Sequence, residues 1–332
     1  MNAEPRSLRV RDEMTAPRPT SGTGSCLEGA ACIINPYSAR QKWSRRRDLN
    51  RFLSRNLPGE IHDTANTKEG TIALAARLAV SHPAIVALGG DGTIADVMQG
   101  IRRAGREKDV VLGIVPLGSG NAFRKSLLIP KDVRRAVRVL KEGWPRPVNL
   151  MEIEGQISGF SSIGATAMVT NTELRHKVKG LWGHVFSGLS LLNLPLWEVT
   201  AELEDGVDDF GRAYDRKTVS LSILDVVVAK SNYFGYSFRI APRASLADEY
   251  LDITFFDMRP RRYLMMFPLT YLGLYQRRLL HFKARRMVLH GRDLPIQYHG
   301  EFLDILDRVE IRMVPQAIQV IAPRRLSGKE PV

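Results

Sequence analysis

An apolar run that ends abruptly in glycines constrains this chain more than any other feature. Residues Ala84 to Leu88 are typical of a buried strand and lead directly into Gly89-Gly90-Asp91-Gly92-Thr93. Glycine lets the backbone approach a ligand closely, and free N–H groups at the start of the next helix attract an anion. A carboxylate such as Asp91 is what a phosphate site needs to hold Mg²⁺ or accept a proton. A tight turn in which Asp91 or Thr93 only caps the following helix would give the same pattern.

Two further loops follow the same plan. Pro116-Leu117-Gly118-Ser119-Gly120-Asn121 comes after the apolar run 110–115, and Asn35-Pro36-Tyr37-Ser38 comes after the run 31–34. A short strand is expected at 60–63, and helical stretches lie between the strands, at 39–57, 68–81, from the first glycine loop to Arg103, and at 133–141. This alternation predicts a parallel, doubly wound sheet, in which such loops meet at the carboxyl edge of the strands. All three loops are therefore expected to line one cleft.

The pattern changes after Pro145-Arg146-Pro147. Short strand-like runs separated by polar turns dominate from there on, which predicts a mostly antiparallel second domain. The last four of these expected strands lie at 286–290, 295–298, 308–313 and 317–321. Helical interruptions are expected at about 177–194 and 261–283. We expect a tail at 1–29, an α/β domain at 30–147, a β-rich domain at 148–323 and a tail at 324–332.

The composition limits the classes of binding partner and the compartment that we expect for this chain. The net charge of +13 over 332 residues favours an anionic partner, such as a nucleotide, a nucleic acid or an acidic membrane surface. Cys26 and Cys32 have no disulfide or metal-ligand spacing, which fits a reducing compartment. A secretory leader pattern and an apolar run of spanning length are both missing from the sequence, so a cytoplasmic location is expected.

The segment 259–286 suits an anionic membrane surface. It carries basic residues at both ends, no acidic residue, and the apolar run Tyr263–Tyr275 between them. Basic flanks around aromatic, methionine and leucine side chains favour binding at a lipid interface. An ordinary buried helix with solvated ends is the alternative interpretation.

Taken in order, several motifs resemble the diacylglycerol kinase catalytic-domain family of lipid kinases, which includes bacterial diacylglycerol kinases, sphingosine kinases and ceramide kinases. The motifs in the second half are Tyr233-Phe234-Gly235, Ala241-Pro242, Asp248-Glu249-Tyr250-Leu251-Asp252 and His299-Gly300-Glu301. The resemblance implies an N-terminal doubly wound, NAD kinase/phosphofructokinase-like ATP-binding domain and a C-terminal antiparallel β-sandwich lipid-binding domain. Its last segment commonly returns toward the first domain.

The resemblance also implies ATP and Mg²⁺ as cofactors and assigns roles to residues. Asp91 and Glu301 are the catalytic candidates, and which of them is the general base stays open. The nucleotide would be contacted by Asn35, Ser38, Thr64, Gly89, Gly90, Asp91, Gly92, Thr93, Gly118, Ser119 and Asn121. Asp248 matches a structural Mg²⁺ ligand of related bacterial enzymes, with Ser245 and Tyr250 nearby.

Some positions depart from the family pattern. The segment Gly164–Met168 lacks an aspartate that members commonly carry there, and a sphingoid ammonium would need a carboxylate partner. This favours a neutral head group, as in ceramide or diacylglycerol. Ala122 stands where acylglycerol kinases often have aspartate, His299 replaces an aspartate, and Asp96 replaces a glutamate.

The sequence therefore predicts an ATP-dependent lipid kinase that transfers the γ-phosphate to the hydroxyl of ceramide, diacylglycerol or a sphingoid lipid. We expect it to lie peripherally on an anionic membrane surface. No nucleic-acid partner is expected, because the interleaved basic and aromatic motifs of known RNA-binding modules are missing. A homodimer is compatible with the sequence. The alternatives are an NAD kinase-like enzyme, a catalytically weak family member that only binds lipid, and a nucleic-acid-binding protein.

Overall fold

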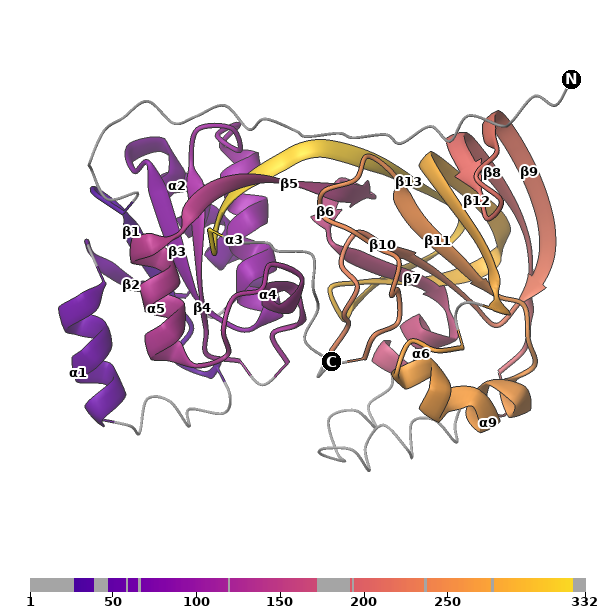
Figure 1. Cartoon of the computed structure of the whole chain (residues 1–332), viewed down its shortest axis with the longest axis horizontal. Helices are drawn as coiled ribbons and strands as arrows, with labels where there is room; N and C mark the ends of the chain where they lie inside the picture. Colours follow the sequence, from indigo (N-terminus) through magenta and orange to yellow (C-terminus); the bar gives the residue numbers. More distant parts are fainter. Residues whose placement is uncertain are drawn as a thin grey trace, which may run out of the picture.

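The computed structural model describes residues 27–324, apart from 39–46, 58, 65–66, 119, 172–191, 193, 236–237 and 276–277. Two halves lie side by side and are joined by long strands (Figure 1). The predicted helical interruption at 177–194 falls almost wholly outside the described residues.

The first half is built on a parallel sheet in the order β4-β3-β1-β2. Its strands are β1 (Ala31–Ile34), β2 (Ile61–Asp63), β3 (Ala84–Gly89) and β4 (Val111–Pro116). Alternate side chains of the strands enter two separate cores. One core packs against α2 (Lys68–Ser81) and α3 (Asp91–Arg103), and the other against α1 (Arg47–Asn56) and α5 (Val133–Glu142). The short helix α4 (Ala122–Ser126) follows the second glycine loop.

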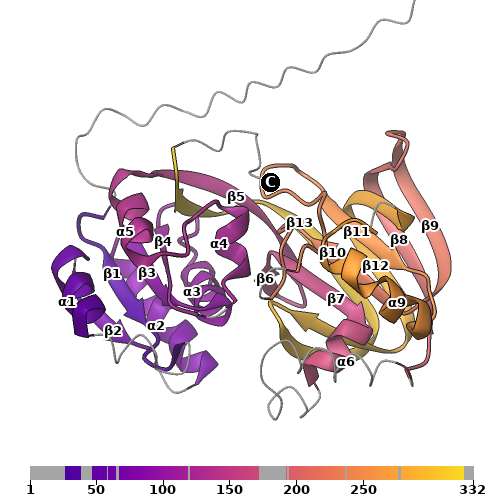
Figure 2. The same cartoon turned by 60° about the horizontal axis from the view of Figure 1, so that its bottom comes forward.

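The second half consists of antiparallel strands around a separate apolar core. Its strands are β5 (Trp144–Ile153), β6 (Gln156–Ser158), β7 (Phe160–Gly164), β8 (Trp197–Asp208), β9 (Ala213–Ile223), β10 (Asp225–Ala229), β11 (Leu251–Phe256), β12 (Leu280–Tyr298) and β13 (Glu301–Ala322). The helices α6 (Ala165–Asn171) and α9 (Pro260–Tyr271) lie at the same end of this half (Figures 1 and 2). The architecture confirms the predicted doubly wound α/β unit followed by an antiparallel β-sandwich.

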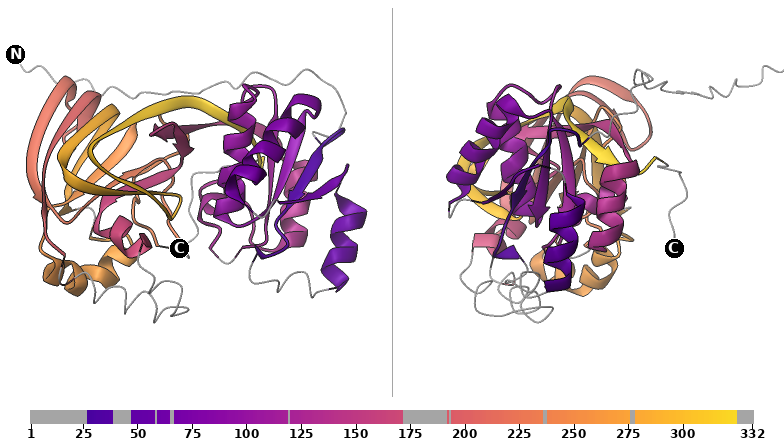
Figure 3. Two further views of the ribbon diagram at one scale, coloured as in Figure 1. Left: turned by 180° about the vertical axis from the view of Figure 1, so that it is seen from behind. Right: turned by 90° about the vertical axis from the view of Figure 1, so that its left-hand side faces the viewer.

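Strand β13 joins the two halves into one hydrogen-bonded sheet. It pairs with β12 and β5 in antiparallel fashion, and its far end runs parallel to β4 through Gln319 and Val320. Figure 3 shows it as a long band that reaches from the second half to the first. The predicted domain boundary at residue 147 falls inside β5, and it stays a prediction.

The structure corrects some predicted elements. The runs 286–290 and 295–298 belong to one strand, β12, and 308–313 and 317–321 belong to β13; each strand contains irregularities where the pairing register shifts. The helix expected at 261–283 ends at Tyr271, and Gly273, with a φ of 75°, turns the chain toward β12. No helix in the described part of the chain has the length and apolar character needed to cross a bilayer.

Polar contacts tie α3 to the second half. The buried Glu152 of β5 pairs with Arg102 of α3 and with Arg312 of β13, whose Nε lies 3.1 Å from the carboxylate. Gln99 Nε2 also donates to the backbone oxygen of Ile157 at 3.0 Å, in a buried position. Because α3 begins at Asp91, these contacts hold the first glycine loop against the second half.

We predict that Glu152→Ala lowers the free energy of unfolding by about 1–2 kcal/mol, because it removes the buried carboxylate that Arg102 and Arg312 share and leaves the partly buried Arg102 without that partner. Urea denaturation followed by circular dichroism would measure it. The matched control is Glu69→Ala, which breaks a pair with Arg103 whose side chains are 71% and 57% exposed. That variant should lose less than about 0.5 kcal/mol. Equal losses of unfolding free energy in the two variants would show that Glu152 stabilises the junction no more than an exposed pair does.

Candidate functional site

The loops that follow the parallel strands are held edge to edge by backbone hydrogen bonds. Asn35 N donates to Leu88 O at 2.9 Å, and Thr64 N donates to Ile34 O at 2.8 Å. Gly89 O accepts from Leu117 N at 2.9 Å and from Gly118 N at 3.1 Å. The three predicted loops therefore meet at one edge of the sheet.

The glycines allow this close approach. A Cβ atom on Gly118 would lie 2.4 Å from the Cα of Gly90, and one on Gly89 would lie 2.5 Å from the Cβ of Thr93. Both distances are shorter than van der Waals contact, so a larger residue at 118 would push the two glycine loops apart and one at 89 would collide with Thr93. Asn35 Nδ2 donates to Thr93 Oγ1 at 3.1 Å, which links the first loop to the second.

Asp91 joins α3 to α4. It is the first residue of α3, and its two carboxylate oxygens accept from Ala122 N at 2.9 Å and Phe123 N at 3.0 Å, at the start of α4. Asn121, with a φ of 52°, makes the turn before these donors. Asp91 therefore does cap a helix, as the alternative interpretation stated, but this helix is α4 and not the following helix α3. The carboxylate is thereby fixed in orientation between the two glycine loops.

Glu301 approaches the same loop from the second half. It follows a two-residue hairpin turn in which His299 and Gly300 have φ values of 47° and 82°, as a tight turn between twisted strands requires. A Cβ atom on Gly92 would lie 3.4 Å from Glu301 Oε1. One on Gly120 would lie 3.2 Å from Asp91 Oδ2 and 3.3 Å from the backbone oxygen of Gly235. The structure therefore brings Asp91 and Glu301 to the same loops.

Lys68, which no local motif marks, holds Glu301 in place. Its ammonium donates to Glu301 Oε2 at 2.8 Å and to the hydroxyl of Tyr298. Burial lowers the pKa of Lys68, but the hydrogen bonds to Glu301 and Tyr298 outweigh it and raise the pKa overall. Lys68 starts α2, so this contact is a second link between the halves.

Asp96 and His299 lie in the electrostatic field of these carboxylates. Burial raises the pKa of Asp96 to about 7, with a further increase from Glu301 that Lys68 opposes. Burial lowers the pKa of His299, whereas Asp91 and Glu301 favour its charged form. Asp96 Oδ1 and His299 Nε2 are buried and have no hydrogen-bond partner among the described residues.

The remaining predicted nucleotide contacts stay predictions. Ser38 and Asn121 are buried; Ser38 N donates to Asn35 O at 3.1 Å, and Asn121 Nδ2 donates to Gly118 O at 2.6 Å. Ser119 lies outside the described residues. Asp248 and Tyr250, predicted at a metal, contact the ammonium of Lys230, and Ser245 Oγ accepts from Ala247 N at 3.1 Å. The described residues contain no group of three or more acidic, histidine or cysteine side chains placed to hold a metal ion.

A buried carboxyl group touches the segment that lacks an aspartate. Thr166, at the start of α6, donates its backbone N–H to Asp225 Oδ2 at 3.0 Å and also donates its hydroxyl. Burial raises the pKa of Asp225 to about 7, although the hydrogen bonds from Thr166 lower it. Asp225 stands on β10, far from Thr166 in sequence, so the contact could not be found from local motifs.

Comparison with known protein families finds a matching family model in each half of the chain. The family model described as diacylglycerol kinase catalytic domain matches residues 29–153. The one described as YegS C-terminal NAD kinase beta sandwich-like domain matches residues 209–322. Together they cover both the glycine loops and the β-sandwich.

Individual relatives agree with this assignment. A diacylglycerol kinase of Mycobacterium tuberculosis is 27% identical over 325 residues, which cover 92% of this chain and 93% of that protein. A diacylglycerol kinase of Bacillus subtilis is 27% identical over 235 residues, covering 68% and 73%. The fold is also similar to the crystal structure of a diacylglycerol kinase from Bacillus anthracis, with a TM-score of 0.65, 20% identity, and coverage of 90% and 98%.

The raised pKa of Asp225 predicts how the free energy of unfolding depends on pH. The folded state keeps a proton that the unfolded state releases above about pH 4, so the free energy of unfolding should fall as pH rises toward 7. Asp225→Asn should remove this loss, and its stability relative to wild type should rise by about 2 kcal/mol between pH 5 and pH 8.

Chemical denaturation across that pH range measures the difference. Asp304→Asn, at an exposed position, is the control and should follow the wild-type pH dependence. If Asp225→Asn also follows it, the carboxyl of Asp225 is ionised in the folded protein at low pH and the prediction is wrong.

Proposed function

The chain belongs to the diacylglycerol kinase catalytic-domain family of lipid kinases, and on that basis we propose that it transfers the γ-phosphate of ATP to the hydroxyl of a neutral lipid. Diacylglycerol and ceramide are the substrates that we favour. The observation that carries the proposal is the meeting of Asp91 and Glu301, from opposite halves, at the glycine loops. Phosphoryl transfer depends mainly on positioning and charge neutralisation, which such a junction supplies.

The phosphates of ATP would lie against the loops of the first half. The backbone at Gly89, Gly90 and Gly118 leaves room for a close approach, and the start of α3 faces the same edge. Mg²⁺ usually binds through one or two carboxylates together with substrate phosphates, and Asp91 fits this donor set. When bound, the ion would offset the charge of the phosphates. Asn35, Ser38 and Thr64 would contact the rest of the nucleotide.

The lipid hydroxyl would enter between the halves beside Asp91. An alcohol must lose its proton as the phosphoryl group arrives, and a carboxylate in hydrogen-bond reach is needed to accept it. Asp91 is held by two backbone N–H groups, whereas Glu301 is paired with Lys68. We favour Asp91 as the acceptor, since Glu301 would first have to leave its ion pair.

The membrane surface would be met by α9. Its buried side carries Tyr263 and Thr270, whereas Met265 and Leu269 are 70% and 44% exposed, and Leu272, just after the helix, is 58% exposed. Arg261 and Arg262 are exposed beside them. An apolar face flanked by arginines suits peripheral binding to anionic lipid.

The reaction is tested with γ-labelled ATP and mixed micelles of diacylglycerol, ceramide, sphingosine or monoacylglycerol, with NAD⁺ as a further acceptor. We expect diacylglycerol or ceramide to be labelled. Asp91→Asn should reduce turnover by at least about 10²-fold while circular dichroism stays unchanged. Glu301→Gln is the paired variant and should retain more activity.

Other results would redirect the proposal. Labelling of NAD⁺ alone would favour the NAD kinase-like alternative, and labelling of no acceptor would favour a family member that only binds lipid. Full activity in Asp91→Asn together with loss in Glu301→Gln would reverse the assignment of the proton acceptor.

Membrane binding is predicted to depend on the apolar face of α9. The double variant Met265→Glu/Leu272→Glu should reduce cosedimentation with anionic vesicles at least about tenfold, because it replaces apolar contacts by charges that anionic lipid repels. Val80→Glu, at a position on α2 that is 66% exposed, is the matched control and should bind as wild type does. Unchanged vesicle binding by the double variant would show that another surface docks.

A further inference from the structure

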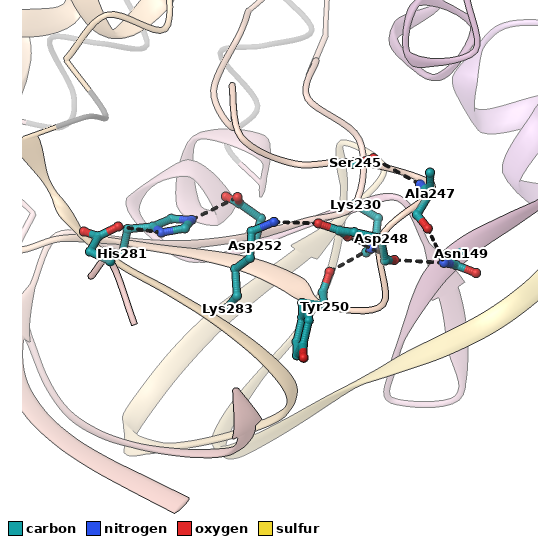
Figure 4. Close-up of polar contacts among 10 residues, drawn as sticks. Asn149, Lys230, Ser245, Ala247, Asp248, Tyr250, Asp252, His281 and Lys283 are labelled. Carbon is teal, nitrogen blue, oxygen red and sulfur yellow. Dashed lines mark hydrogen bonds and ion pairs between the residues drawn. The ribbon is translucent and has the colours of Figure 1, made fainter. Parts of the chain in front are cut away.

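A lysine lies wholly inside the second half. Lys230 follows β10 directly, and its side chain has no exposed surface. A buried ammonium needs partners for its N–H groups, because an unpaired buried charge is very costly. Lys230 Nζ donates to Asp248 Oδ1 at 2.5 Å, to Asp248 O at 2.6 Å and to Tyr250 O at 2.7 Å (Figure 4). All three donors of the ammonium are therefore used.

These partners form a set of oxygens of the kind that hard metal ions prefer, one carboxylate and two backbone carbonyls. We refer to Asp248 Oδ1, Asp248 O and Tyr250 O as the oxygen cage. Asn149 Nδ2 donates to Asp248 O at 2.8 Å and to Ala247 O at 3.2 Å, which ties the loop that carries the cage to β5. The backbone N–H of Lys230 donates to Gly159 O at 2.9 Å, so the lysine is anchored at both ends.

The charges around the cage oppose a second cation. Lys283 Nζ donates to Asp248 Oδ2 at 2.6 Å, so two ammonium groups share one carboxylate. The nearby Asp252 is already paired with His281, at 2.9 Å. A divalent ion would have to displace Lys230 and remain close to Lys283, and both steps are electrostatically unfavourable.

We propose that the ammonium of Lys230 takes the place of a structural metal ion, so that the loop 245–250 folds without metal. The residues therefore do not fit the Mg²⁺ site that the family resemblance implied at Asp248, Ser245 and Tyr250. Burial lowers the pKa of Lys230 and the charge of Asp248 opposes that effect, which is the balance expected of an internal cation with one carboxylate partner. The proposal concerns the fold of the second half and does not depend on the substrate.

Thermal unfolding without nucleotide, in EDTA and in Mg²⁺ or Mn²⁺, tests the proposal. Wild type should have the same Tm in all three solutions, apart from any metal response that Lys283→Ala shares. Lys230→Ala should lower Tm in EDTA by roughly 10 °C, because it empties a fully buried position and removes the ammonium that Asp248 Oδ1 and Tyr250 O accept from. Mg²⁺ or Mn²⁺ should restore part of that loss, since the vacated oxygen cage then offers ligands to a metal.

Lys283→Ala is the matched control. Its side chain is 30% exposed, and within the described part of the chain its ammonium donates only to Asp248 Oδ2, so the cage and Lys230 stay in place. A smaller decrease in Tm and no response to metal are expected. A change in Tm on adding metal that is common to wild type, Lys283→Ala and Lys230→Ala reports binding at the nucleotide site. This common change is subtracted from the change seen in Lys230→Ala.

Two results would overturn the proposal. One is a metal-induced rise in the Tm of wild type that Asp248→Asn abolishes, which would show a metal bound beside Lys230. The other is a Lys230→Ala protein that does not respond to metal beyond the control. If Lys230→Ala does not fold, native mass spectrometry of desalted wild type decides: metal-free protein supports the proposal, and a retained divalent ion that Asp248→Asn removes refutes it.

Discussion

The hydrogen-bond ladder of β13 determines how the two halves of this protein meet. One end of the strand pairs with β12 in the β-sandwich, and the other end runs beside β4 of the parallel sheet. A strand advances about 3.3 Å per residue and cannot stretch, so its length sets the distance between the two ends. Glu301 is the first residue of β13 and Val320 pairs with Leu112 near its end. The position of Glu301 beside the glycine loops therefore depends on pairing at the far end of the same strand.

The candidate site depends on a second set of links across this junction. Asp91 binds the start of α4, and Lys68 of α2 binds Glu301. Each contact orients a carboxylate whose position would otherwise vary with side-chain rotation. A rigid arrangement of this kind suits a reaction in which little covalent chemistry is left to the protein and most of the barrier is lowered by positioning.

Basic side chains neutralise buried or half-buried carboxylates throughout the structure. Arg102 and Arg312 pair with Glu152, Lys68 pairs with Glu301, and Lys230 and Lys283 pair with Asp248. Five of the 48 lysines and arginines are thus used inside the fold and at its junctions, whereas the arginines beside α9 remain exposed. In our proposal Lys230 extends this pattern to a position where the related fold was expected to use a metal.

The sequence alone determined the elements whose signals are local. The bounds of β1 and α2 agree with the predicted 31–34 and 68–81, because apolar runs and the Thr67 cap act within a few residues. The motifs also led to Asp91 and Glu301. Only the tertiary structure decided that Lys68 holds Glu301, that Asp225 meets Thr166 and that Lys230 fills the cage at Asp248. Each of these pairs joins residues far apart in the chain, and a lysine or aspartate carries no local pattern that names its distant partner. The long strands β12 and β13 were likewise divided in the prediction, since their continuity depends on neighbouring strands, which local periodicity does not record.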